Sequence, residues 1–256
     1  MSTQFMLPSS DPALYEKATR IAHEFAQQSI SDELVGIVFL GAITRGYFDR
    51  AADVDISLMK KAGSAFDIPN KFFKVDGIEV HCWLSEYESE CTATWDMAKR
   101  WTFAQGQIYY DPTGKIAQLL AEKVPLQPEE KRWLLMSGLV LSEWYINGLS
   151  RLWVDRGNLI SAHHMFGQGV NFFFDMLSGL NNQLVADMKW RYYCVEQFER
   201  LPQRFPERMQ EIMMLHAVTL EELDRRQAVF MAMWREMQPV VEAEVKMSFD
   251  EMVQLV

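Results

Sequence analysis

Cysteine is scarce in this chain, and so are the long apolar runs that membranes require. Three cysteines, Cys82, Cys91 and Cys194, stand far apart among 256 residues. An odd and scattered set of thiols predicts reduced cysteines in a cytoplasmic protein rather than a disulfide framework. No uncharged apolar run is long enough to span a membrane. Residues 1–10 lack the basic and apolar regions of a signal peptide, so we expect none.

Positive charge is also limited. The 25 Lys and Arg residues are outnumbered by 35 Asp and Glu residues, which gives a formal net charge of −10. No block of basic residues is present, and this argues against a long nucleic acid held through its phosphates. The apolar content of 49% is enough for a proper core, and 256 residues suit one large domain or two ordinary ones. An acidic surface suits a cationic small molecule, but this is a weak guide.

The most informative stretch is a pair of predicted strands. The apolar run Leu34–Leu40 predicts a buried strand that ends at Gly41. After a short turn, a second predicted strand, Val54–Met59, has Asp53 and Asp55 at its start. Side chains alternate along a strand, so the two aspartates point to one face, roughly 6 to 7 Å apart along the chain. Two carboxylates so placed repel each other, and a shared divalent cation such as Mg²⁺, which prefers oxygen ligands, relieves that repulsion.

The turn between these strands favours an anion. Gly41 allows a phosphate to approach the backbone closely, and N–H groups at the start of the next helical turn favour negative charge. The ordinary alternative is a hairpin with surface aspartates, which Asp-x-Asp alone would favour. The preceding glycine turn and the spacing favour a binding site instead.

The pattern is an apolar residue, Gly, a small residue, about ten residues and then Asp-apolar-Asp-apolar. It resembles the signature of the DNA polymerase beta-like nucleotidyltransferase superfamily. The family's Gly-Ser or Gly-Gly is Gly41-Ala42 here, so only the backbone N–H of Ala42 is available to a phosphate. Arg45-Gly46 resembles the Arg-Gly of the antibiotic-modifying branch, of the aminoglycoside or kanamycin type. The resemblance implies that ATP or another NTP binds with its triphosphate against Gly41–Gly46.

The same resemblance implies a third carboxylate on a strand beside the paired one. Lys71–Val75 and Ile78–Leu84 flank an Asp-Gly turn, which is a strong hairpin signal. Glu79 is the acidic residue inside the second arm, and in the resemblance it binds a second metal ion or helps to deprotonate the attacking hydroxyl. The alternative for Glu79 is a solvated strand carboxylate. His81 shares its face, but a lone strand histidine is usually just half-buried, so we do not assign it as a ligand.

The rest of this half contains helices and one more strand. Helices are predicted over residues 11–28, with Asp11 as the N-cap, and over 85–101, from a capping-box pattern. A short strand is predicted at 108–110. The turn that follows it, Asp-Pro-Thr-Gly, also resembles the antibiotic nucleotidyltransferases, where it closes the catalytic domain. Asp111 is expected to be a turn residue rather than a catalytic one.

Residues 124–128 are the best domain boundary, because strand signals vanish beyond them and helical periodicity takes over. We therefore expect a catalytic domain over 1–123, an α/β unit with a mixed sheet, and an all-helical domain over 125–256. The layout of the second resembles the helical partner domain of kanamycin-type nucleotidyltransferases, which implies an acceptor-binding role. Ligand sites favour domain interfaces, so an active cleft is expected between the two. Helices are predicted over 128–156, 159–177, 189–199, 206–215 and 219–245.

Two residues of the helical half are further candidates. Glu143 lies among apolar neighbours, an environment that raises a carboxyl pKa and suits a general base. The ordinary alternative, a carboxylate on an amphipathic helix, is favoured. Lys189 either places positive charge near a nucleotide phosphate or is a plain surface residue. His163 and His164 are adjacent and face different ways on a helix, which argues against a metal site there.

The resemblance as a whole implies nucleotidyl transfer. Asp53 and Asp55 hold Mg²⁺, and with Glu79 they hold two ions. An acceptor hydroxyl on a small, aminoglycoside-like molecule attacks the α-phosphorus, displaces pyrophosphate and receives the nucleotide, and a role in antibiotic resistance is implied by the same analogy. Two alternatives stay open: a catalytically weak nucleotide-binding or regulatory protein of the same fold, to which Ala42 points, and an enzyme that adenylylates a protein. The sequence does not assign the oligomeric state.

Overall fold

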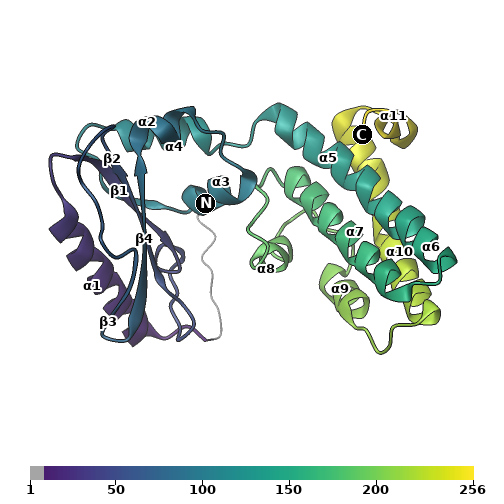
Figure 1. Ribbon diagram of the computed structural model, residues 1–256. Helices are drawn as coiled ribbons and strands as arrows, with labels where there is room; N and C mark the ends of the chain where they lie inside the picture. The colour runs from purple at the N-terminus through teal and green to yellow at the C-terminus, as the bar shows by residue number, and fades with distance from the viewer. Residues whose placement is uncertain (1–8) are drawn as a thin grey trace. The chain divides into compact units, whose positions relative to one another are not determined.

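A computed structural model describes residues 9–256, which divide between Pro125 and Leu126 into two compact units (Figure 1). The first unit contains a mixed five-stranded sheet with helices, and the described part of the second contains helices and no strand. These observations confirm the predicted fold class. Within the described residues, no helix combines the length and the apolar character needed to cross a membrane.

The sheet has the strand order β3-β4-β2-β1-β5. Most neighbouring strands are antiparallel, but β2 and β4 are parallel, because the β3–β4 hairpin returns the chain to the edge of β2. A bulge at the start of β1 shifts its register by one residue. The strands are β1 (Leu34–Gly41), β2 (Val54–Lys60), β3 (Phe72–Val75), β4 (Ile78–Glu86) and β5 (Gln107–Tyr110).

Helix α1 (Pro12–Ser29) covers one face of the sheet (Figure 1). Asp11 caps it as predicted, because its side chain accepts hydrogen bonds from the first amides of the helix. The His23 ring lies 5.2 Å from that of Phe39, a residue of β1 that pairs with Ile56 of β2. Paired residues on adjacent strands share a face, so the fully buried Val54, Ile56 and Leu58 belong to the α1 side.

The opposite face carries the aspartates and is covered by the remaining helices of the unit. Helices α3 (Met97–Ala104) and α4 (Lys115–Lys123) lie against β1, and α2 (Tyr87–Thr92) lies against β4. Apolar side chains of the strands, such as Val38 and Met59, pack there against the buried Phe103 and Ile116. This packing fixes the orientation of β1 and β2 next to the turn that joins them.

The helix predicted over 85–101 is wrong in its bounds. Strand β4 continues to Glu86 because its parallel pairing with β2 continues to that residue. Glu86 then precedes α2 without a side-chain cap, so the capping box does not form. Helix α2 ends at its C-cap, Ala93. Asp96 then caps a separate helix, α3, by accepting a hydrogen bond of 2.7 Å from the amide of Lys99.

The second unit is organised around two long helices, α7 and α10, which bury Phe166, Phe173 and Phe230. The long helix predicted over 128–156 is interrupted by a π-helical segment, Trp144–Leu149, and the helix predicted over 189–199 is only Arg191–Val195. The helices are α5 (Pro128–Glu143), α6 (Ser150–Asp155), α7 (Leu159–Leu180), α8 (Arg191–Val195), α9 (Phe205–Met213), α10 (Leu220–Val245) and α11 (Phe249–Val253).

Candidate metal centre

Two neighbouring strands bring three potential ligands together. Asp53 directly precedes β2, and Asp55 is the second residue of that strand. The parallel register pairs Asp55 with His81 of β4, so the carboxylate and the imidazole point to the same face. Because both strands lie inside the sheet, the backbone hydrogen bonds of β2 and β4 fix this alignment.

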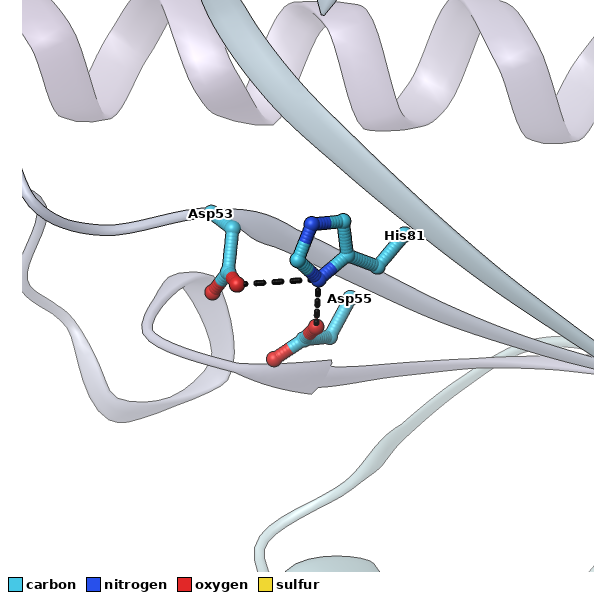
Figure 2. Close-up of side chains that lie close together, drawn as sticks. All are labelled: Asp53, Asp55 and His81. Atoms are coloured by element: carbon cyan, nitrogen blue, oxygen red, sulfur yellow. Dashed lines mark ion pairs between the residues drawn. The ribbon is translucent and has the colours of Figure 1, made fainter. Parts of the chain in front are cut away.

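The three side chains converge on one point (Figure 2). His81 Nδ1 lies 3.0 Å from Asp53 Oδ2 and 3.8 Å from Asp55 Oδ1. One donor atom from each residue lies within 4.8 Å of the others. All three side chains are partly buried, with exposed fractions of 35% for Asp53, 19% for Asp55 and 24% for His81.

The two separations from His81 are compatible with a shared small divalent cation, and the shorter one is also that of a hydrogen bond between an imidazole and a carboxylate. Two ligand atoms that are each about 2.1 Å from an ion and at right angles to each other lie about 3 Å apart. The 3.0 Å and 3.8 Å separations are close to that value. Two carboxylates and a neutral imidazole also supply the negative charge that compensates for a divalent ion, and three protein ligands leave positions for substrate oxygens.

Gly41 makes room for one of the ligands. Its backbone has φ +71°, in the left-handed region that favours glycine. A Cβ at this position would lie 2.2 Å from Asp55 Oδ2, so the carboxylate occupies the space that a side chain would fill. The glycine that the sequence associates with a phosphate therefore has a second role, which is to admit Asp55.

The turn after β1 is a short 3₁₀ helix, Ile43–Arg45, and much of it is enclosed. Ala42 is buried, and the exposed Gly46 has φ +77°. Arg45 is also buried, with its Nε donating a 3.0 Å hydrogen bond to Gln105 and its guanidinium carbon 4.4 Å from the centre of the Trp101 ring. Arg45 thus ties the turn to the end of α3, and a phosphate contact from its side chain stays a prediction.

Glu79 lies on the same sheet face but outside the group of three. Lys74 is its partner across the β3–β4 hairpin, and Lys74 Nζ lies 2.8 Å from Glu79 Oε1. The hydrogen bond and the charge of Lys74 lower the pKa of the Glu79 carboxyl. Its other oxygen, Oε2, lies 3.8 Å from His81 Nε2, on the side of the imidazole away from the aspartates. Its role as a metal ligand stays a prediction.

Burial raises the pKa of two ionisable groups next to the centre. Burial, with a smaller contribution from the charge of Asp55, raises the pKa of the Cys82 thiol to about 12. Burial also raises the pKa of Tyr47 to about 12, although the neighbouring Arg45 opposes that shift. Neither group is ionised near neutral pH, so neither adds negative charge to that of the aspartates.

A cavity of about 410 Å³ opens beside Asp55, within the first unit. Asp55 and Ser57 of β2 bound it on one side, and Trp83, with 45% of its surface exposed, provides an aromatic wall. Lys99 of α3 supplies a cation, held 2.6 Å from the carboxylate of Glu90. The complete lining is Leu40, Asp55, Ser57, Trp83, Leu84, Ser85, Glu90, Lys99, Thr102 and Phe103.

The remaining predicted residues belong to the second unit. Glu143 ends α5, and its Oε1 accepts a 2.9 Å hydrogen bond from Asn147 in the π-helical segment. Lys189 is exposed in a turn before α8, and its backbone amide donates to Asp187. The functional roles of both side chains stay predictions.

Sequence reasoning considered His81 without assigning it as a ligand, and it did not single out Trp83 or Lys99 as functional residues. His81 could have been found from the period-2 pattern once β4 was paired in parallel with β2, because strand alternation places it on the face of Asp55. Lys99 had no such signal. It lines the cavity from α3, which begins separately at Met97 instead of continuing the predicted long helix.

Comparisons with known proteins give a likeness in structure rather than in sequence. No protein-family model matches the sequence, and no curated protein matches it. Among solved structures, the chain is similar to a nucleotidyltransferase-like protein from Exiguobacterium sibiricum 255-15, with a TM-score of 0.48 and 11% sequence identity. The match covers 90% of this chain and 77% of that chain.

Proposed function

We propose that this protein is a metal-dependent nucleotidyltransferase that moves a nucleoside monophosphate, AMP in the first instance, from an NTP to an acceptor hydroxyl. The observation that carries the proposal is the convergence of Asp53, Asp55 and His81 beside the Gly41 turn and a cavity of about 410 Å³. The glycine-turn and Asp-x-Asp pattern of the sequence supports the same reaction. The acceptor is proposed to be a small, aminoglycoside-like molecule.

The residues of the centre have distinct tasks in this reaction. A bound divalent cation supplies positive charge that stabilises the attacking and leaving oxygens during in-line displacement at the α-phosphorus. Asp53 and Asp55, whose side chains are partly buried, would hold that ion, and Gly41 keeps space for the Asp55 carboxylate. The exposed Gly46 leaves the backbone of the turn open to phosphate oxygens.

The cavity suits the nucleoside of the NTP. Trp83 offers an aromatic face on which a base can stack, and Ser57 and Thr102 offer hydroxyl groups to a sugar or a base edge. Asp55 is part of the cavity lining, so a nucleoside bound with its 5′ end toward Asp55 would bring its phosphates next to the metal ligands. Binding of the acceptor is proposed to depend on the helical unit. In the same unit, Glu143 is proposed as a general base and Lys189 as a contact to a nucleotide phosphate.

The proposal is tested by pyrophosphate release. The purified protein is mixed with each of the four NTPs, Mg²⁺ or Mn²⁺, and a panel of hydroxyl-bearing aminoglycosides, and the modified acceptor is identified by mass. We expect Asp55→Asn to lower turnover by at least about 100-fold, because several kcal/mol of transition-state stabilisation depend on the ion. Trp83→Ala should raise the KM for the NTP by roughly 10-fold through lost base stacking.

Asp32→Asn is the matched control, because Asp32 is exposed just before the other end of β1. It should leave turnover unchanged. Equal turnover in Asp55→Asn and the wild type would contradict the metal-dependent reaction. Nucleotide binding without pyrophosphate release for any acceptor would favour a regulatory protein of the same fold, and release only in the presence of a protein acceptor would favour protein adenylylation.

A further inference from the structure

We infer that His81 is a direct metal ligand through Nδ1 and that Glu79 orients its imidazole from the other side, so that the centre selects Mn²⁺ or Co²⁺ over Mg²⁺. The inference rests on the metal site of the proposed function and specifies its ligands and its metal. It replaces the three-carboxylate arrangement that the sequence pattern predicts with two carboxylates and one imidazole.

The orientation of the His81 imidazole supports the assignment of Nδ1 as the ligand atom. The ring turns Nδ1, rather than Nε2, toward both aspartates (Figure 2). An ion bound to Asp53 and Asp55 therefore lies next to that nitrogen, and the 3.0 Å separation from Asp53 is the one expected for neighbouring ligands. Any ion bridging the two aspartates would have His81 Nδ1 in reach without a change of strand register.

Aromatic neighbours hold the ring in this orientation. The Phe72 ring contacts that of His81 edge-to-face, with 5.0 Å between the ring centres. The Trp83 ring lies perpendicular to the imidazole at 6.3 Å, two residues further along β4. The two rings restrict rotation of the side chain, so little conformational entropy is lost when the nitrogen binds an ion.

Glu79 supplies the outer partner that metal-binding histidines use. A ligating histidine usually donates its second ring N–H to a carboxylate or carbonyl, which fixes the tautomer and makes the ligating nitrogen a better donor. Glu79 Oε2 lies 3.8 Å from His81 Nε2, and Lys74 holds the other oxygen at 2.8 Å. At 3.8 Å the carboxylate and Nε2 do not form a hydrogen bond, so the orienting role requires Glu79 to move closer to the ring when the ion is bound.

The ligand types determine the choice of metal. Mg²⁺ strongly prefers oxygen donors, whereas imidazole suits transition metals, and affinity rises from Mn²⁺ to Co²⁺ along the divalent series. Two carboxylates and one imidazole retain enough oxygen character for Mn²⁺. The same ligands lower the affinity for Mg²⁺, which would have to accept a nitrogen donor or bind without His81.

The test measures the ligands and the affinity separately from activity. The full chain is loaded with Mn²⁺, and pulsed electron paramagnetic resonance records coupling to a directly bound nitrogen, with ¹⁵N-histidine labelling to identify its source. Titration calorimetry gives the Mn²⁺ to Mg²⁺ affinity ratio. We expect nitrogen coupling in the wild type, none in His81→Asp, and a ratio that falls by roughly 10-fold in His81→Asp, since the set becomes three carboxylates.

His164→Asn serves as the control, because His164 is an exposed histidine of the second unit. It should keep both the coupling and the ratio. Mn²⁺ binding that depends on Asp55 but shows no histidine nitrogen would overturn the inference and leave the proposed metal-dependent reaction intact. A failure of both Mn²⁺ and Mg²⁺ to bind would overturn the inference together with the metal site on which it rests.

The orienting role of Glu79 has its own readout. Glu79→Gln should keep the nitrogen coupling and weaken Mn²⁺ binding by roughly 10-fold, as changes of outer partners do at other metal sites. Lys74→Gln, which leaves the carboxylate in place, should weaken it less. An unchanged Mn²⁺ affinity in Glu79→Gln would remove Glu79 from the arrangement.

Discussion

At the scale of single residues, Gly41 and Asp55 depend on each other. The Asp55 carboxylate fills the space of the missing side chain, and the backbone of Gly41 has a positive φ. We predict that Gly41→Ala lowers the free energy of unfolding by about 1 kcal/mol through left-handed strain. It should also displace Asp55 and abolish tight binding of Mn²⁺ or Mg²⁺, measured by titration calorimetry.

A matched glycine separates the two effects. Gly63 has φ +68°, and apart from its two chain neighbours no atom lies within 4 Å of the position that a Cβ would take. Gly63→Ala should therefore cost a similar amount of stability and leave the metal affinity unchanged. If Gly41→Ala binds the ion as tightly as Gly63→Ala does, then Asp55 does not need the space beside Gly41.

Single residues also show where sequence reasoning stops. Asp53, Asp55 and Gly41 lie in one local pattern, so their shared location follows from strand alternation and a turn. His81 reaches them through the parallel register of β2 and β4, which depends on sheet formation between distant segments. The burial of Arg45 depends in the same way on Trp101 and Gln105 of a later segment. Such contacts have no local signal in a single sequence.

At the scale of elements, α5 and α7 approach each other closely at a glycine. A Cβ on Gly138 would lie 2.6 Å from the Cβ of Met176 and 2.7 Å from the carbonyl oxygen of Phe172. We predict that Gly138→Ala lowers the free energy of unfolding by roughly 1 to 3 kcal/mol, the usual cost of overpacking. Urea denaturation followed by circular dichroism measures the change.

Gly167, in the interior of α7, provides the contrast. Apart from its chain neighbours and the backbone of its own helix, a Cβ added there would meet no atom within 4 Å, so Gly167→Ala gains helix propensity without a clash. It should raise the free energy of unfolding by roughly 0.5 to 1 kcal/mol. If Gly138→Ala and Gly167→Ala changed the free energy of unfolding in the same direction, the close approach of α5 and α7 would not determine the effect of an added Cβ.

Elements with strong local signals were predicted well. The β3–β4 hairpin, the capped helix α1 and the long helices α7 and α10 lie close to their expected bounds. The misplaced start of α2 has a physical cause, since pairing with β2 keeps residues 85 and 86 in an extended conformation despite their capping pattern. Tertiary pairing there overrides a local preference.

At the scale of the whole molecule, the candidate centre belongs entirely to the first unit. Its ligands come from the start of β2 and from β4, so an ion would link two strands of one sheet. We predict that saturating Mn²⁺ slows hydrogen exchange of residues 54–60 and 78–86. At a metal concentration of about 100 times Kd, the stabilisation should be about 2.7 kcal/mol.

The helical unit supplies the internal reference for that measurement. Peptides from α7 and α10 should exchange at the same rate with and without the ion. Asp55→Asn should remove the protection of the two strands. Equal slowing in both units would indicate that the ion acts elsewhere than at Asp53, Asp55 and His81.

The strand order of the sheet also bears on how this protein behaves at high concentration. The long strands β1, β2 and β4 are in the interior, whereas both edges are four-residue strands, β3 and β5. A short edge presents few unpaired N–H and C=O groups, and Lys74 adds a charge on β3. The sheet that holds the candidate centre therefore offers little template for strand addition by another molecule, which disfavours edge-to-edge aggregation of the folded chain.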